Sequence, residues 1–185
     1  MKAMEKIYLS PVNLKDDALF QFLSTGLSRR FSLPCAIIPL KQDLSFAFSP
    51  KKGQFHSSEI LKRLKAVIPD DCLRILIVVD RDLYVPELNF VFGEAELGGP
   101  AAIISLCRLY PEFYRMKPDV LLFRERTLKE AVHELGHTFR LAHCTNPSCV
   151  MFFSNSLLDT DRKTSDFCAV CRRKLLRFLS LQRMD

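Results

Sequence analysis

The clearest hydrophobic pattern in the chain runs from Leu73 to Val79, where nearly every residue is β-branched or leucine. A run of this length without alternation predicts a strand buried on both faces, in the middle of a sheet. Shorter apolar runs predict further strands over 6–12, 33–40, 88–96 and 101–110. We expect the last of these to be an edge strand, because it follows the break at Gly98-Gly99-Pro100. Such an edge could pair with an extended peptide.

Helices are predicted where apolar residues recur every three or four positions. One should span about 16–30 with Asn13 as its cap, one should run from Ser57 or Ser58 to about Ile68, and one should cover 170–181. We expect 119–123 to be strand-like and the chain between His143 and Phe167 to be rich in loops. The alternation of helices and strands predicts an α+β or α/β lobe followed by a small second lobe.

A further helix is expected to begin at about Leu128, because Thr127 and Glu130 have the spacing of a capping box. Its apolar stripe consists of Leu128, Val132, Leu135 and Phe139. The remaining face of this helix is free to carry polar side chains into a cleft.

That polar face carries His133 and His137, which are four residues apart and can therefore share one metal ion. Glu134 is placed to reach a water on the metal, and His143 would complete three neutral nitrogen ligands with one position open. This is the design of a catalytic zinc site. The alternative is an exposed helix with two unrelated histidines. It is disfavoured because three of the chain's 4 histidines fall between residues 133 and 143.

Four of the 7 cysteines form two pairs, Cys144 with Cys149 and Cys168 with Cys171. We expect no secretion signal, because the N-terminal residues lead into a strand-like run, and these pairs then favour metal binding over disulfides. Four thiolates around zinc would form a closed structural site that joins the chain after His143 to the C-terminal helix. Disulfides, an iron–sulfur cluster and a redox pair are the alternatives.

The chain has 185 residues with 48% hydrophobic content, which suffices for a single domain over residues 1–185. We expect an N-terminal lobe over 1–143 and a C-terminal lobe over 144–185. The net charge of +6 permits nucleic-acid binding, but the charges form no long block. Apolar runs are too short for a membrane span. A monomeric cytoplasmic protein without nucleic-acid or membrane partners is therefore expected.

The histidine and cysteine motifs, with Met151 shortly after Cys149, resemble the metzincin metalloproteases and in particular their archaemetzincin branch. The segment from Asp82 to Ala95 is also similar to that branch. The resemblance implies a mixed, twisted sheet with flanking helices and an active-site helix. It implies two zinc ions, one catalytic and one structural. The implied ligands of the catalytic zinc are His133, His137 and His143, and those of the structural zinc are Cys144, Cys149, Cys168 and Cys171. Glu134 would be the general base, and Met151 the methionine of the turn below the metal.

The chain departs from the family pattern at Arg140 and in the spacing of Met151 and Cys168, which sixteen residues separate where seventeen are expected. Arg140 stands where the family has a glycine that lets the chain turn sharply after the helix, so we expect Arg140 to adopt a left-handed conformation. Phe153 stands where some metzincins have a tyrosine that assists the oxyanion. Tyr84, Tyr110 and Tyr114 are the candidates to replace that hydroxyl.

The expected function is hydrolysis of a peptide or protein substrate by a zinc-activated water, with Glu134 as general base. Endopeptidase and aminopeptidase action stay open; Glu94 and Glu96 are the acidic pair that could bind an α-amine. The alternatives are a catalytically silent zinc-binding protein of the same fold, and a nucleic-acid-binding protein that uses the basic C-terminal helix.

Overall fold

The fold is built on a five-stranded mixed sheet with the order β2-β1-β5-β8-β7, seen in a computed structural model that describes residues 6–64 and 68–182. Its strands are β1 (Lys6–Pro11), β2 (Cys35–Ile37), β5 (Cys72–Val79), β7 (Gly93–Ala95) and β8 (Ala101–Ser105). All neighbours are parallel except β7, which runs antiparallel to β8. The predicted mixed sheet with flanking helices is confirmed.

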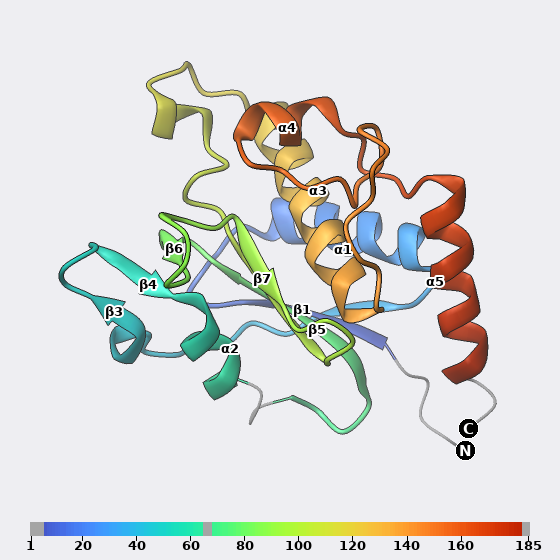
Figure 1. Ribbon diagram of the computed structural model, residues 1–185. Helices are drawn as coiled ribbons and strands as arrows, with labels where there is room; N and C mark the ends of the chain where they lie inside the picture. Colours follow the sequence, from blue (N-terminus) through green and yellow to red (C-terminus); the bar gives the residue numbers. More distant parts are fainter. Residues whose placement is uncertain (1–5, 65–67, 183–185) are drawn as a thin grey trace.

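Helices cover both faces of this sheet (Figure 1). One face packs against α1 (Asp17–Phe31), α3 (Val120–Thr138) and α5 (Ala169–Gln182). The other packs against α2 (Ser57–Leu64) and a small sheet of β3 (Phe48–Ser49), β4 (Gln54–His56) and β6 (Leu83–Tyr84). Short helices η1 (Ser45–Ala47), η3 (Pro111–Tyr114) and α4 (Leu157–Arg162) complete the described chain. Among the described residues, no helix is long and apolar enough to cross a membrane.

Strand β5 lies in the centre, as its continuous apolar run predicted. Leu76 and Val78 point into the core shared with α1 and α3, whereas Ile75 and Ile77 point into the core shared with α2. Because successive side chains of a strand point to opposite faces, a strand buried on both faces needs apolar residues on both, and β5 has them at every position from Ile75 to Val79.

The start of α3 differs from the expectation. Asp119 is the cap, because its carboxylate accepts a hydrogen bond from the backbone N–H of Leu122 at 2.9 Å. The segment 119–123 is therefore the first turn of a helix and not strand-like. The capping box predicted at Thr127 is also wrong: this residue lies inside the helix, and its hydroxyl donates to the carbonyl of Phe123 at 2.8 Å.

The predicted cap of α1 was also wrong. Asp16 caps that helix by accepting from the N–H of Leu19 at 2.9 Å. Asn13 instead adopts φ 56°, and its side chain donates to the carbonyl of Gln42 at 2.6 Å. The helix expected from Ser57 is described as far as Leu64, and its expected continuation through residues 65–67 lies outside the described residues.

The assignment of the edge strand is corrected. Strand β8 ends at Ser105 and lies between β5 and β7, so β7 is the edge strand on this side of the sheet and β2 the edge strand on the other. The chain reverses at Gly98, whose φ is 75°, and this reversal pairs β7 with β8. Of the strand expected over 88–96, only 93–95 forms regular pairs. The loop-rich segment before Phe167 contains α4, which is capped by Ser156 and Asp159.

Candidate metal centre

Helix α3 approaches the edge strand closely because Gly93 has no side chain. A Cβ atom at Gly93 would lie 2.6 Å from Cγ of Glu134 and 2.7 Å from the carbonyl oxygen of Ile103. Gly136, on helix α3, likewise allows a close approach, because a Cβ atom there would clash with the sulfur of Met151. The two glycines therefore let the helix lie between strand β7 and the turn that carries Met151.

The three predicted histidines come together. The ligating atoms of His133, His137 and His143 all lie within 4.8 Å of one another. Nδ1 of His133 lies 2.8 Å from the carbonyl oxygen of Val150, and Nδ1 of His137 lies 2.7 Å from that of Leu141. A carbonyl oxygen only accepts, so both Nδ1 atoms donate, and the Nε2 atoms keep their lone pairs.

The expected left-handed conformation of Arg140 is confirmed, with φ 61°. It ends the helix in a turn in which Arg140 N–H donates to the carbonyl of His137 at 2.9 Å and Leu141 N–H donates to that of Gly136 at 3.1 Å. The chain then returns, and the ring of His143 lies with its centroid 4.9 Å from that of His137. An arginine here therefore keeps the turn that a glycine favours.

The donor set fits a zinc ion. The Nε2 atoms of His133 and His137 lie 3.1 Å apart, and two neutral nitrogen lone pairs at that distance repel unless a cation lies between them. Burial holds the pKa of His133 well below its usual value, which favours the neutral ring that binds metals. Nitrogen atoms about 2.0–2.1 Å from a tetrahedral zinc would be separated by about 3.3 Å.

Glu134 is buried beside this histidine group, with 7% of its surface exposed. Burial raises the pKa of its carboxyl well above the usual value, and the nearby Glu130 raises it further. Both glutamates and His133 line a cleft of about 230 Å³ between the edge strand and the segment after Met151. The other residues lining the cleft are Leu88, Asn89, Phe90, Val91, Phe92, Gly93, Phe153, Ser154 and Asn155.

A buried ion pair, which the sequence did not reveal, joins α3 to the segment after α4. The ammonium of Lys163, which is fully buried, lies 3.1 Å from Oε1 of Glu130. The same carboxylate oxygen accepts from the hydroxyl of Thr160 at 3.0 Å. Sequence patterns placed Lys163 in a loop of few apolar residues, where a lysine is ordinarily solvated. The one sequence signal for Glu130 is its position four residues before Glu134, which places both side chains on the same side of the helix.

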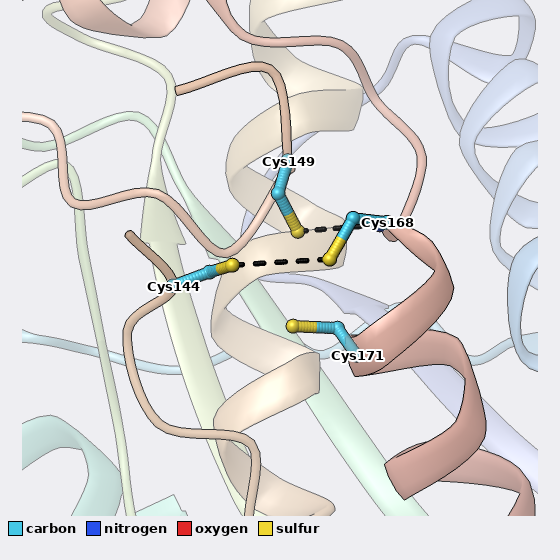
Figure 2. A group of neighbouring side chains, drawn as sticks. All are labelled: Cys144, Cys149, Cys168 and Cys171. Carbon is cyan, nitrogen blue, oxygen red and sulfur yellow. Dashed lines mark hydrogen bonds between the residues drawn. The ribbon is translucent and has the colours of Figure 1, made fainter. Parts of the chain in front are cut away.

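The four predicted cysteines also come together, although the two pairs are far apart in sequence (Figure 2). Sγ of Cys144 lies 3.8 Å from Sγ of Cys168, far beyond the about 2.05 Å of a disulfide. The backbone N–H of Cys168 donates to Sγ of Cys149 at 3.3 Å. Sulfur atoms about 2.3 Å from a tetrahedral zinc would be about 3.8 Å apart, so this group fits zinc as well.

The thiols of Cys149, Cys168 and Cys171 differ in their pKa values. A hydrogen bond from the backbone N–H of Cys171 lowers the pKa of Cys168 to about 7, whereas burial raises the pKa values of Cys149 and Cys171. The group is tied to the histidine site, because Cys144 follows His143 directly and its N–H donates to the carbonyl of Met151 at 2.9 Å.

The tyrosines expected to assist the oxyanion lie elsewhere. The ring of Phe153 lies 4.7 Å from that of His143 and offers no hydroxyl. Tyr110 stacks on Phe123, and the hydroxyl of Tyr114 donates to the carbonyl of Arg108. Neither they nor Tyr84 line the cleft.

A buried glutamate beside three histidines, two on one helix and one on the chain that returns after it, in a cleft along a sheet edge, defines the class of metal-dependent hydrolases. Comparisons with known proteins narrow this class. Residues 23–177 match the family model described as Peptidase family M54. The archaemetzincin of Methanocaldococcus jannaschii is 43% identical over 175 residues, which cover 95% of either chain.

Solved structures agree with this result. The crystal structure of archaemetzincin from Methanopyrus kandleri matches with a TM-score of 0.84 and 35% identity, covering 96% of either chain. That of a zinc-dependent peptidase from Methanocorpusculum labreanum matches with a TM-score of 0.84 and 32% identity, covering 91% of this chain and 99% of that one. The chain belongs to peptidase family M54, the archaemetzincins, and is by that membership a zinc metallopeptidase.

Proposed function

We propose that this peptidase cleaves peptide bonds at a zinc held by His133, His137 and His143, with Glu134 as general base. One observation carries the proposal: the Nε2 atoms of His133 and His137 lie 3.1 Å apart. The Nδ1 atoms of the same two rings donate to backbone carbonyls. That arrangement leaves the lone pairs of two neighbouring Nε2 atoms available to one ion, in the cleft that the buried carboxylate of Glu134 also lines.

Zinc in such a site supplies Lewis acidity, which makes water more acidic and stabilises negative charge on a carbonyl oxygen. The chain's own part is proton transfer. An oxygen of Glu134 accepts a proton from the attacking water and later gives it to the nitrogen of the leaving amine. The raised pKa of this buried carboxyl favours holding the proton between the two steps.

The substrate would lie along β7, the edge strand next to the histidines, where an extended peptide can add as a further strand. The sequence had predicted that a peptide could pair with the strand over 101–110. That strand lies in the interior of the sheet and has no free edge for a peptide. The cleft beside β7 has aromatic walls of Phe90, Phe92 and Phe153, which suit an apolar side chain of the peptide.

Endopeptidase action is better supported than aminopeptidase action. An aminopeptidase needs a carboxylate for the α-amine, but both oxygens of Glu94 accept hydrogen bonds, from Ser57 and from Ser58. We expect N-acetylated peptides to be cleaved at rates similar to those of free peptides. Cleavage confined to peptides with a free amine would contradict this assignment.

We propose a second, structural zinc on Cys144, Cys149, Cys168 and Cys171, supported by their spacing and by the absence of disulfides among them. Met151 would form the floor below the catalytic zinc, where its sulfur rests on Gly136. The lobes over 1–143 and 144–185 stay predictions. So do a monomeric state, a cytoplasmic location and the lack of nucleic-acid binding.

Replacing the proposed base tests the mechanism. Glu134→Gln keeps the size of the side chain and removes its ability to take a proton, so hydrolysis should fall by at least about 100-fold. The variant should retain both metal ions and the stability of the parent, measured by metal analysis and thermal unfolding. Activity close to that of the parent would remove Glu134 from the mechanism.

Metal content tests the two sites separately. Purified parent protein should contain two zinc ions, His137→Ala should contain one, and Cys171→Ser should also lose one, because each variant removes a ligand from a different group. If the parent contains one zinc ion and His137→Ala contains the same amount, only a structural site is present, and the peptidase mechanism is contradicted.

A further inference from the structure

A second cavity lies at the ends of the parallel strands, away from the metal centre. Its volume is about 380 Å³, and it shares no lining residue with the cleft beside β7. It is lined by Val12, Asn13, Leu14, Gln42, Asp43, Leu44, Ser45, Phe48, Phe55, Val79, Asp80 and Arg81. The volume falls within the range of about 300–1,000 Å³ that is usual for small-molecule sites.

The topology explains why a crevice opens here. Strands β1 and β5 are parallel neighbours, and the cavity is lined by the residues that follow their carboxyl ends. The chain leaving β1 turns to the face covered by α1, with Leu14 against that core, whereas the chain leaving β5 turns to the opposite face, with Leu83 in the core of α2. Two loops that diverge in this way leave a gap, and open sheets with parallel strands bind ligands at such switch points.

The apolar wall of the cavity contains two aromatic rings. Phe48 and Phe55 lie with ring centroids 5.1 Å apart, and Phe48 keeps 44% of its surface exposed. Pairs of this kind offer a face to an apolar side chain of a ligand.

The polar groups have opposite charges. Among the described residues, the carboxylate of half-buried Asp80 has no hydrogen-bond donor, and burial raises its pKa. That of Asp43, in contrast, is satisfied by the backbone and hydroxyl of Ser45. The guanidinium of exposed Arg81 uses one nitrogen for the carbonyl of Asp80, at 3.1 Å, and lies 5.8 Å from the ring of Phe55. An ammonium ion would satisfy Asp80, and a carboxylate would suit Arg81.

The loop after β1, which begins at Val12 and lines the cavity, is held in a fixed shape. Asn13, with φ 56°, donates to the carbonyl of Gln42 at 2.6 Å and accepts from its N–H at 3.2 Å. This two-way contact ties the end of β1 to the segment that carries Asp43 and Leu44, so one wall of the cavity is formed before any ligand arrives.

We propose that this cavity binds a small zwitterion with an apolar side chain, namely a free amino acid or a short peptide. Asp80 takes its ammonium group, Arg81 takes its carboxylate, and the rings of Phe48 and Phe55 contact its side chain. Peptide hydrolysis releases molecules of this class, but the binding itself does not depend on the proposed catalytic mechanism.

The test uses the metal-loaded full chain and L-phenylalanine as probe, followed by chemical-shift changes of the backbone amides. Shifts should appear at Asn13, Gln42 and Val79–Arg81. N-acetyl-L-phenylalanine, which lacks the ammonium group, and L-phenylalaninamide, which lacks the carboxylate, should each bind about tenfold more weakly. No shifts, or shifts confined to the cleft around His133 and Glu134, would overturn the proposal.

Variants assign the contacts. Asp80→Asn should weaken binding of L-phenylalanine about tenfold, whereas Glu125→Gln, on an exposed position of α3, should leave it unchanged. Arg81→Gln should abolish the preference for the acid over the amide, which tests the site even if Asp80→Asn fails to fold. Equal binding by the parent and by both cavity variants would refute the assignment. Peptide hydrolysis by the parent is measured in parallel. Failure of the proposed mechanism would appear in that assay, whereas failure of the cavity proposal would appear only in the binding of L-phenylalanine.

Discussion

At the scale of single residues, Arg140 decides whether the third histidine reaches the other two. Its φ of 61° lies in the left-handed region, which costs a non-glycine residue roughly 1–2 kcal/mol. Its side chain covers Gly98, where a Cβ atom would lie 2.9 Å from Cγ of Arg140. The turn is thus held by its surroundings, and a residue other than glycine is accommodated.

Two substitutions at this position separate backbone strain from side-chain contact. Arg140→Gly and Arg140→Ala both remove the arginine side chain, but only glycine removes the strain. Arg140→Gly should therefore be more stable than Arg140→Ala by about 1 kcal/mol in urea unfolding. Equal stabilities, or a more stable alanine variant, would show that the turn is not strained.

At the scale of elements, α3 carries both the proposed metal ligands and the proposed base, and its place is set by what it contacts. It packs against β7 through Gly93 and against the segment after α4 through the ion pair of Glu130 with Lys163. The bidentate pair of Arg126 with Asp161, at 2.7 Å for either oxygen, adds a second link. The helix is thereby fixed on two sides of the cleft.

Gly93→Ala should displace Glu134, because the added Cβ would lie 2.6 Å from its Cγ and 2.7 Å from a backbone oxygen that cannot move easily. A shift of about 1 Å would lower kcat/KM by roughly 100-fold. Gly26→Ala is the control: its Cβ would meet only the end of the Leu128 side chain, at 2.7 Å. It should lose stability but keep its activity per folded molecule. Similar activity in both variants would contradict the prediction.

Lys163→Met should leave the buried carboxylate of Glu130 without its cation, with only the hydrogen bond from Thr160 remaining, and the free energy of unfolding should fall by about 3–5 kcal/mol. The double variant Lys163→Met with Glu130→Gln removes the uncompensated charge and should recover much of that loss in urea unfolding. If the double variant is as unstable as the single one, the ion pair does not explain the effect.

At the scale of the whole molecule, the cysteine group connects the turn after the histidine site to α5. That helix in turn contacts α1, since a guanidinium nitrogen of Arg172 donates to the carbonyl of Arg30. The segment between Cys149 and Cys168 also meets α1, because Arg30 donates to the carbonyl of Ser165 at 2.6 Å. A metal on the four thiolates would therefore hold the C-terminal region to the main core.

Loss of this metal should lower stability more than loss of the other. Cys171→Ser should reduce the midpoint of thermal unfolding by roughly 10 °C, as expected for a loss of several kcal/mol in a chain of this size. His137→Ala, which affects the open site, should change it less. A larger decrease of the unfolding midpoint in His137→Ala would indicate that the metal at the histidines contributes more to stability than the metal at the cysteines.

The sequence by itself determined the two groups of candidate metal ligands and the central strand. Residues four apart on a helix must share a face, so His133 and His137 could be placed without coordinates, and a continuous apolar run such as that of β5 can only be buried on both sides. The conformation of Arg140 was predictable only through the family resemblance, because the family pattern has a glycine at this turn.

Tertiary structure alone decided which strand is the edge, where α3 begins, and what Lys163 and Asp80 face. An edge depends on which strands pair across the chain, and Asp119 and Thr127 both carry the chemistry of a cap, so local patterns could not choose between them. A lysine in a polar loop looks solvated until another element buries it. Likewise, the second cavity arises only where two loops leave neighbouring strands on opposite faces of the sheet.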